Sequence, residues 1–366
     1  MGSASGPARI ALSLGALALT LGALELGVRV VAPQPMGVHI PDDLRRGPFV
    51  VPGQHALHTS EFEVQVHVNQ DGFVDTEWSP RRADVPRVLV VGDSFVQAAQ
   101  VPLEDGLGRL LARGLTQAQG REVEVLSMGV PGAGTATALD LIRGPGIALE
   151  PDVVVLGFLV SNDIMNNHPL LEGKADKPFY RLVDGQLVRT DRASALSSGV
   201  EHLPLWAVSH AVRWMARRWW VDAEVKRQLS IGEGLPISLR VHDPEQGPVW
   251  EEAWAVTDAM LAELSALCQS RGIRFGVMLI PDEVQVSPLA RKRLQSQWPQ
   301  SAGWRMDIAT ERVAVMAAQY AEVLDLQPGL EREEGRLYFP EDGHWTPAGH
   351  AAAASTAVPW LSAMLE

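Results

Sequence analysis

From residue 87 onward, short runs of apolar and β-branched residues alternate with longer stretches in which apolar positions recur every three to four residues. The short runs have the length of buried strands, and the longer stretches have the period of amphipathic helices. Strands and helices in alternation predict a parallel sheet covered by helices on both faces. We therefore expect an α/β fold, a three-layer αβα sandwich around a five-stranded, mostly parallel, flavodoxin-like sheet, with strands at residues 87–91, 123–128, 152–160, 274–280 and 321–326.

The region before residue 86 has a different pattern. Residues 62–68 alternate strictly between apolar and polar side chains, which predicts a half-buried strand that ends in a turn at 70–72. The preceding stretch is rich in Pro and Gly and is typical of a linker. We expect three parts: an apolar N-terminal segment over 1–34, a linker and β-rich extension over 35–85, and the α/β domain over 86–366.

The N-terminal segment is apolar from Ile10 to Val31, apart from Ser13, Thr20, Glu25 and Arg29. As a helix, a stretch of this length rises about 33 Å, enough to cross the hydrocarbon core of a bilayer. We expect a transmembrane helix that acts as an uncleaved signal anchor, with the rest of the chain outside the cytoplasm, in the periplasm or at the cell surface. A cleaved signal peptide is the main alternative, and a buried core helix is a third.

Residues 165–250 interrupt the alternation of strands and helices and are interpreted as an insertion. Asp184 and Gly185 predict the turn of a β-hairpin within it. Residues 207–229 combine several tryptophans and arginines in one helical stretch. We expect a helix that packs on the domain through its Trp face, with a lid or a membrane- or polymer-binding surface as the alternative.

Composition narrows the function. The chain has 366 residues and a formal net charge of -13, so attraction of the whole protein to nucleic acid is not expected. Its single cysteine, Cys268, lies in a helical stretch and is interpreted as a small buried residue. We find neither a phosphate-binding loop of the Walker type nor a cluster of metal-ligand residues, and therefore expect no cofactor and no metal.

The first strand of the domain ends in Gly92-Asp93-Ser94. In parallel α/β sheets, chemistry gathers at the carboxyl ends of the strands, so Ser94 is a candidate nucleophile. A serine hydroxyl needs a base, usually a histidine that a carboxylate orients. Asp342 and His344 lie in the loop after the fifth strand, at the same edge of the sheet, and Glu341 is the alternative acid.

The loop that contains Asp342 and His344 is expected to end at a helix start. Thr346 followed by Pro347 predicts a helix start with Thr as the N-cap, so the loop ends there. His350 then falls within the helix and is interpreted as structural.

Acyl transfer also needs hydrogen-bond donors for the developing oxyanion. The Gly-rich loop after the second strand exposes backbone N–H groups, with Gly132 allowing close approach. Asn162, after the third strand, offers a side-chain amide, and the N–H of Ser94 is a third candidate donor.

This ordered set of loops resembles the SGNH (GDSL-type) hydrolase superfamily over roughly residues 85–366. The resemblance implies that Ser94 is the nucleophile, that Gly132 and Asn162 bind the oxyanion, and that Asp342 and His344 complete a triad. The sequence differs from the family pattern in Phe95, in Val160 and in an acid placed two rather than three residues before the histidine. The Asp-x-His-Trp block is similar to polysaccharide O-acetyltransferases of the same superfamily, in which the Asp-His pair precedes the serine.

The resemblance implies an esterase acting on O-acyl esters of an extracytoplasmic glycan or of a small molecule. An O-acyltransferase that modifies a cell-envelope polysaccharide is the alternative, and it would need a multi-span membrane partner to deliver the acyl donor. A non-catalytic glycan-binding protein on the same fold is a third hypothesis, which the complete set of Ser, His, Asp, Gly and Asn disfavours.

Overall fold

The structure is a computed structural model of the 366-residue chain. It describes residues 6–31, 45–46, 49–50, 52–172, 177–190, 209–212, 214–215 and 234–366.

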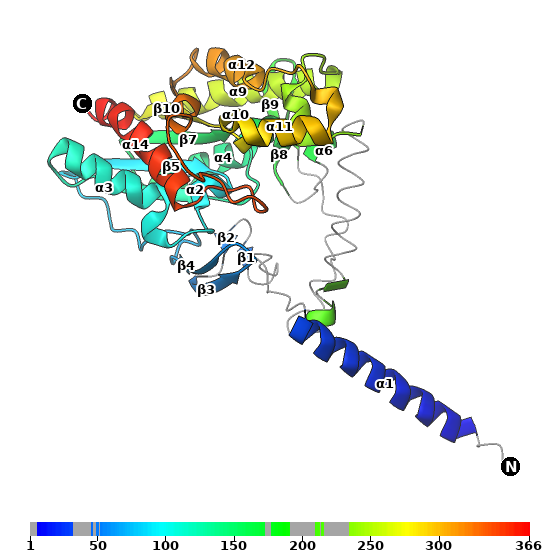
Figure 1. Ribbon diagram of the computed structural model, residues 1–366. Helices are drawn as coiled ribbons and strands as arrows, with labels where there is room; N and C mark the ends of the chain where they lie inside the picture. The colour runs from blue at the N-terminus through cyan, green and yellow to red at the C-terminus, as the bar shows by residue number, and fades with distance from the viewer. Residues whose placement is uncertain are drawn as a thin grey trace.

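A five-stranded parallel sheet forms the centre of the domain (Figure 1). Its strand order is β11-β10-β7-β5-β6, and every neighbouring pair is parallel. The predicted α/β fold with a parallel sheet is confirmed. The strands are β5 (Arg87–Gly92), β6 (Glu124–Gly129), β7 (Val153–Leu159), β10 (Arg274–Ile280) and β11 (Glu322–Asp325).

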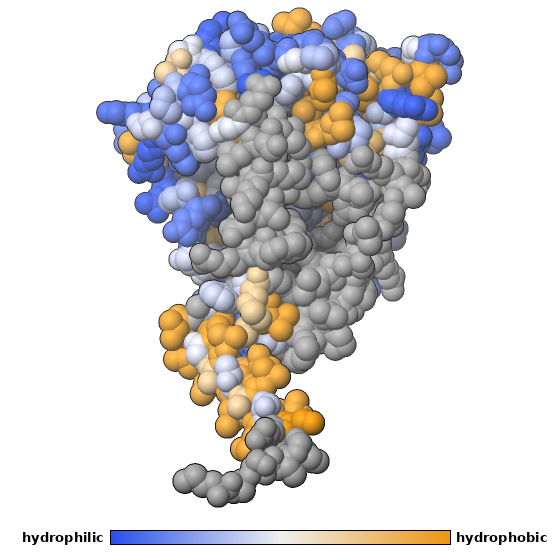
Figure 2. All heavy atoms as spheres, turned by 90° about the vertical axis from the view of Figure 1, so that its right-hand side faces the viewer, coloured by the Kyte–Doolittle hydropathy of each residue, from blue (hydrophilic) through white to orange (hydrophobic). Residues whose placement is uncertain are grey.

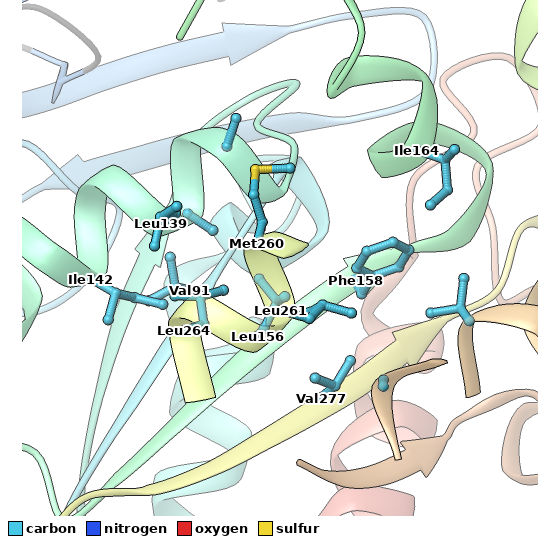
Figure 3. Packing of buried hydrophobic residues seen from close by; sticks show 14 of the residues in the cluster. Val91, Leu139, Ile142, Leu156, Phe158, Ile164, Met260, Leu261, Leu264 and Val277 are labelled. Carbon is cyan, nitrogen blue, oxygen red and sulfur yellow. The ribbon is translucent and has the colours of Figure 1, made fainter. Parts of the chain in front are cut away.

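Side chains alternate between the two faces of the sheet because successive residues of a strand point in opposite directions. On β5, Leu89 and Val91 join one core while Val88 and Val90 join the other, and all four are fully buried. Figure 3 shows the first core, where Leu139 and Met260 pack with the strand residues. The helices against this face are α4 (Thr135–Leu141), α5 (Val160–Asn166), α9 (Pro248–Gln269) and α12 (Ile308–Ala317).

The second core lies under two long helices, α3 (Leu107–Gln119) and α14 (Pro347–Met364). The start of α14 is as predicted, because the Thr346 hydroxyl accepts from the N–H of Gly349 and Pro347 is the first helical residue. The described residues also contain shorter helices: α2 (Ser94–Gln97), a 3-10 turn (Leu103–Asp105), a π-helical turn (Ile142–Gly146), α6 (Pro169–Glu172), a 3-10 helix (Ile237–His242), α10 (Glu283–Val286), α11 (Pro288–Gln297), a 3-10 turn (Pro299–Ser301) and α13 (Gln327–Leu330).

The N-terminal helix α1 (Gly6–Val31) extends away from the domain (Figure 1). Its segment Ile10–Val31 is long and apolar enough to cross a membrane, and its apolar surface is uncovered (Figure 2). A helix of this kind could serve as a membrane anchor or as a signal sequence. Its exposure argues against the third interpretation, a buried core helix.

In the described part of the chain, three two-stranded antiparallel sheets lie outside the central sheet: β1 (Arg45–Arg46) with β2 (Phe49–Val50), β3 (Gly53–His58) with β4 (Glu63–Val68), and β8 (Phe179–Val183) with β9 (Gln186–Thr190). The alternating stretch forms β4, and Val64, Val66 and Val68 are its buried side. The third sheet is the predicted hairpin, and Asp184 and Gly185 adopt positive φ angles in its turn.

The helix predicted within residues 207–229 and the predicted domain boundaries remain predictions. Most of the Trp- and Arg-rich stretch 207–229 lies outside the described residues, as does part of the linker. The domain boundaries at 34 and 85 are likewise not tested, although β3 and β4 pack against the α/β domain, as shown below.

Candidate active site

The candidate nucleophile sits at the junction of β5 and α2. Asp93 is the N-cap of α2, and its Oδ1 accepts from the N–H of Phe95 at 2.9 Å. A Cβ on Gly92 would lie 2.8 Å from the Gly157 carbonyl oxygen, and one on Gly129 would lie 2.1 Å from the backbone nitrogen of Gln97. Glycine at these two positions therefore lets the strand turn directly into the helix and present Ser94 at the sheet edge.

The candidate base and acid lie on a narrow turn between α13 and α14. Tyr338 pairs with Trp345, the Phe339 N–H donates to the His344 carbonyl at 2.8 Å, and Gly343 takes a φ of 82°. The turn returns the chain so that His344 faces Ser94, 250 residues away in sequence.

Ser94, His344 and Asp342 form one chain of hydrogen bonds. His344 Nε2 lies 2.6 Å from Ser94 Oγ, and His344 Nδ1 lies 2.6 Å from Asp342 Oδ1. A carboxylate can only accept, so Nδ1 carries the proton and Nε2 is free to accept from the serine hydroxyl. Glu341, the alternative acid, instead accepts from the Ser60 hydroxyl at 2.8 Å.

Aromatic side chains also pack against the imidazole of His344. The Phe95 ring centroid lies 5.0 Å from that of His344 and 4.9 Å from that of Trp345, the latter with an edge-to-face geometry. Phe95 and Trp345 are buried. Aromatic pairs of this kind favour particular ring orientations. The contact with buried Phe95 therefore helps to orient the His344 ring.

Gly132 lies in the loop that follows β6, and Asn162 lies in the first turn of α5, which follows β7 directly. Both are at the same sheet edge as Ser94. Gly132 has a φ of 65°, and its carbonyl accepts from Asn166 Nδ2 at 3.1 Å and from Lys177 Nζ at 2.5 Å. Within the described residues, the Gly132 N–H and the Asn162 side chain donate to no protein group, and neither residue hydrogen-bonds to Ser94.

Sequence reasoning missed the two groups that hold Gly132. Lys177 also pairs with the buried Glu172 at 2.6 Å. Lys177 lies 45 residues beyond Gly132, in the insertion, where no pattern pointed to the site. Asn166 lies four residues beyond Asn162 on α5, and a helical reading of that stretch could have placed it on the same side.

Two buried carboxyl groups lie beneath the nucleophile. Burial raises the pKa of Asp93 to about 6, although the Phe95 N–H and the charge of His344 favour its ionised form. Burial and the neighbouring charge of Asp93 raise the pKa of Asp163 well above its usual range. Both acids adjoin motif residues, in Gly-Asp-Ser and Asn-Asp, and this position next to the candidate site residues is the signal that could have identified them.

A further polar cluster follows β10. The Ser161 hydroxyl donates to Asp282 Oδ1 at 2.8 Å, and Asp282 Oδ2 lies 3.8 Å from Nε2 of the fully buried His242. Asp282 also caps α10 with Gln285. Across the described ranges, no group of three or more His, Cys, Asp or Glu side chains is arranged to hold a metal ion.

His350 gives a test of the packing behind the site. It is buried against Trp345, and burial together with the charge of His344 lowers its pKa to about 3. The unfolded chain therefore binds more protons than the folded protein between pH 3 and 6.5, so this residue's contribution to stability is complete above pH 6.5 and is lost as the pH falls toward 3.

We expect the free energy of unfolding to depend less steeply on pH below 6.5 in His350→Leu than in the wild type. Asp93 and Asp163, whose pKa values are raised, contribute in the opposite direction in both proteins and cancel in the comparison. Denaturant melts of the detergent-solubilised protein between pH 4 and 7 measure the two slopes. Equal slopes would show that His350 does not titrate on unfolding.

The C-terminal part of the chain is similar to a known protein family. Residues 245–361 match the family described as the SGNH hydrolase-like domain of the acetyltransferase AlgX. This match supports an SGNH-type superfamily for the chain. The resemblance drawn from the four loops is confirmed at the level of this superfamily. No match is found among curated proteins.

Solved structures similar to this chain include the following three. TesA is 14% identical, with a TM-score of 0.40, and the match covers 76% of this chain and 99% of TesA. The acetyl xylan esterase AlAXEase is 12% identical, with a TM-score of 0.39 and coverage of 75% and 98%. The lipase/acylhydrolase from Enterococcus faecalis is 14% identical, with a TM-score of 0.37 and coverage of 76% and 96%. Likenesses of this strength say nothing about the substrate of the SGNH domain.

Proposed function

We propose that this protein is a serine ester hydrolase of the SGNH type, in which Ser94, His344 and Asp342 form the catalytic triad. The observation that carries the proposal is the unbroken chain of contacts from Asp342 Oδ1 through His344 to Ser94 Oγ, 2.6 Å at each step. A nucleophile within hydrogen-bond reach of a base that a third group orients is the arrangement that activates a serine. The same chain of contacts disfavours a non-catalytic binding protein.

The geometry supports a two-step mechanism. Ser94 Oγ attacks the carbonyl carbon of the ester while His344 Nε2 accepts its proton, and Asp342 stabilises the imidazolium that forms. His344 then protonates the leaving alcohol, and the acyl group stays on Ser94. In the second step His344 takes a proton from water, which attacks the acyl-enzyme. His344 then returns the proton to Ser94 Oγ as the bond to the acyl carbon breaks and the acid leaves.

The oxyanion of each tetrahedral intermediate needs fixed donors. We assign this role to the backbone N–H groups of Gly132 and Ser94 and to the side-chain amide of Asn162. The free Gly132 N–H supports the assignment, and so do the contacts that Lys177 and Asn166 make to the Gly132 carbonyl, because donors held in place in advance stabilise charge without reorganisation.

The proposed substrate is an O-acyl ester of an extracytoplasmic glycan or of a small molecule. The uncovered apolar helix α1 supports a membrane-anchored location with the catalytic domain outside the cytoplasm. The family match, a domain described for an acetyltransferase, supports short acyl groups. The side chains of His344 and Asp342, which are 24% and 28% accessible, support a site open to a bulky polymer.

An O-acyltransferase is the second candidate, favoured by the same family description. In this case a sugar hydroxyl replaces water in the second step. Since α1 is the one candidate span in the described part of the chain, we propose that a multi-span membrane partner would supply the acyl donor.

One experiment separates the two candidates. The full-length protein in detergent micelles is incubated with p-nitrophenyl acetate, with and without an oligosaccharide acceptor, and the products are analysed by mass spectrometry. A hydrolase releases acetate whether or not the acceptor is present, and this is the result we expect. Acetylation of the oligosaccharide would favour the transferase, and an absence of both products would contradict the proposed function.

A further inference from the structure

The turn between β3 and β4 lies against the turn that carries the catalytic acid. Glu61 Oε2 accepts from the backbone N–H of Asp342 at 2.7 Å and from that of Glu341 at 3.1 Å. The Ser60 hydroxyl donates to Glu341 at 2.8 Å, and the Phe62 ring lies 5.1 Å from that of Phe339. Three consecutive residues of the N-terminal extension therefore contact a turn that lies some 280 positions further along the chain.

Glu61 is itself held by its own turn. The Thr59 N–H donates to the Phe62 carbonyl at 2.9 Å, and the Thr59 hydroxyl accepts from the N–H groups of Glu61 and Phe62 at 3.1 Å each. These bonds hold the backbone at Glu61 independently of its contact with Asp342. They therefore restrict the positions that the Glu61 carboxylate can take.

The hairpin is also fixed to the domain near the nucleophile. The buried side chains of β3 and β4 form a small core with Ala99 and Leu103, which follow α2, the helix that begins at Ser94. Figure 1 shows the hairpin as a separate small sheet beside the domain. One rigid element therefore contacts both the segment after the nucleophile and the turn of the acid.

The acid's turn needs such a support. Its internal bonds run between Phe339, Gly343 and His344, so they leave the N–H groups of Glu341 and Asp342 without an acceptor inside the turn. Two successive N–H groups that point the same way form a site for an anion, and the Glu61 carboxylate fills it. The backbone of Asp342 is thereby fixed while its side chain binds His344 Nδ1.

We propose that Glu61 is a positioning residue of the active site, and that the hairpin Gly53–His58 with Glu63–Val68 is a functional part of the catalytic domain rather than a spacer. This inference rests on the proposed function. Glu61 acts through Asp342: it holds the backbone from which the acid reaches His344, and so keeps the imidazole aligned with Ser94. A residue of the segment between α1 and the domain therefore supports the acid of the triad.

Glu61→Ala should lower kcat for p-nitrophenyl acetate by up to about 100-fold, because small misplacements of catalytic groups cost about this much. KM should change by less than about two-fold, since the loss concerns the alignment of the triad and not ester binding. Glu61→Gln keeps an oxygen that can accept both N–H groups and should recover most of the rate. A merely structural role would not lower kcat at unchanged KM and also allow Glu61→Gln to restore the rate.

Glu63→Ala is the matched control, because Glu63 follows on the same hairpin with a side chain that is 76% exposed and contacts only His58, at 3.5 Å. It should leave kcat unchanged. Ser60→Ala, which removes only the contact to Glu341, should cost less than about three-fold. Full-length variants are compared in detergent, with thermal melting as a check on folding.

The outcomes separate this inference from the proposed function. If Ser94→Ala abolishes turnover but folded Glu61→Ala and Glu61→Gln both keep the wild-type kcat, the inference is wrong and the triad stands. If Glu61→Ala does not fold, Glu61→Asp serves instead, because its shorter side chain withdraws the carboxylate from the two N–H groups. The wild-type kcat in folded Glu61→Asp would then overturn the inference. If the wild type has no turnover that depends on Ser94, both claims fall together.

Discussion

Ser94→Ala removes the nucleophile and should lower kcat/KM for p-nitrophenyl acetate by at least about 10³-fold, and by as much as about 10⁶-fold. The alanine cannot form the acyl-enzyme, so His344 loses the group whose proton it accepts. Residual turnover over the uncatalysed rate can still come from the oxyanion donors and from binding of the ester. Stopped assays with the full-length protein in micelles measure the loss.

Ser355→Ala is the control for this variant. Ser355 is an exposed serine on α14 whose hydroxyl bonds only to the Ala352 carbonyl of its own helix. Its replacement should leave the rate and the melting temperature unchanged. Comparable activity in folded Ser94→Ala and Ser355→Ala would remove Ser94 from the mechanism.

Asp342→Asn should lower kcat by about 10⁴-fold with little change in folding. The amide has nearly the shape of the carboxylate, but it no longer stabilises the imidazolium, and its NH₂ group can bind a deprotonated Nδ1. The proton then sits on Nε2, which can no longer accept from Ser94. Steady-state kinetics from pH 6 to 9 measure the effect.

The neighbouring Glu341 decides which acid orients the base. Its side chain binds Ser60 and not His344, so Glu341→Ala should change kcat by less than about three-fold. Losses of similar size in Asp342→Asn and Glu341→Ala would contradict the assignment of the acid. A larger loss in Glu341→Ala would transfer the role to that residue.

Much of the domain could be predicted from local patterns. Four strands of the sheet, β5, β6, β7 and β10, are almost wholly buried, so their sequences contain apolar runs that stand out from the amphipathic helices between them. The edge strand β11 is only partly buried. The parallel arrangement then brings the carboxyl ends of β5, β6 and β7 to one edge, which is why residues as distant as Ser94 and Asn162 could be assigned to one site. The cap of α14 could also be predicted, because Thr346 and Pro347 act locally.

What escaped prediction depends on contacts between distant segments. The contact of Glu61 with the Asp342 turn joins residues about 280 positions apart, and an isolated Glu in a polar turn has no local signature. Lys177, which donates to the Gly132 carbonyl, lies in the insertion. The sequence of the insertion has no periodic pattern that indicates a contact with the site. The choice of Asp342 over Glu341 likewise depends on which way each side chain turns, and this was left open by the spacing to His344.

The most direct test of the central claim is the site of covalent labelling by a fluorophosphonate. The full-length protein in micelles is treated with the probe and digested with trypsin, which releases residues 88–109 as one peptide with Ser94 as its only serine. We expect the probe mass on this peptide in the wild type, with labelling slowed strongly in His344→Ala and abolished in Ser94→Ala. Labelling that survives in Ser94→Ala, or an adduct on a different peptide, would contradict the assignment of Ser94 as the nucleophile.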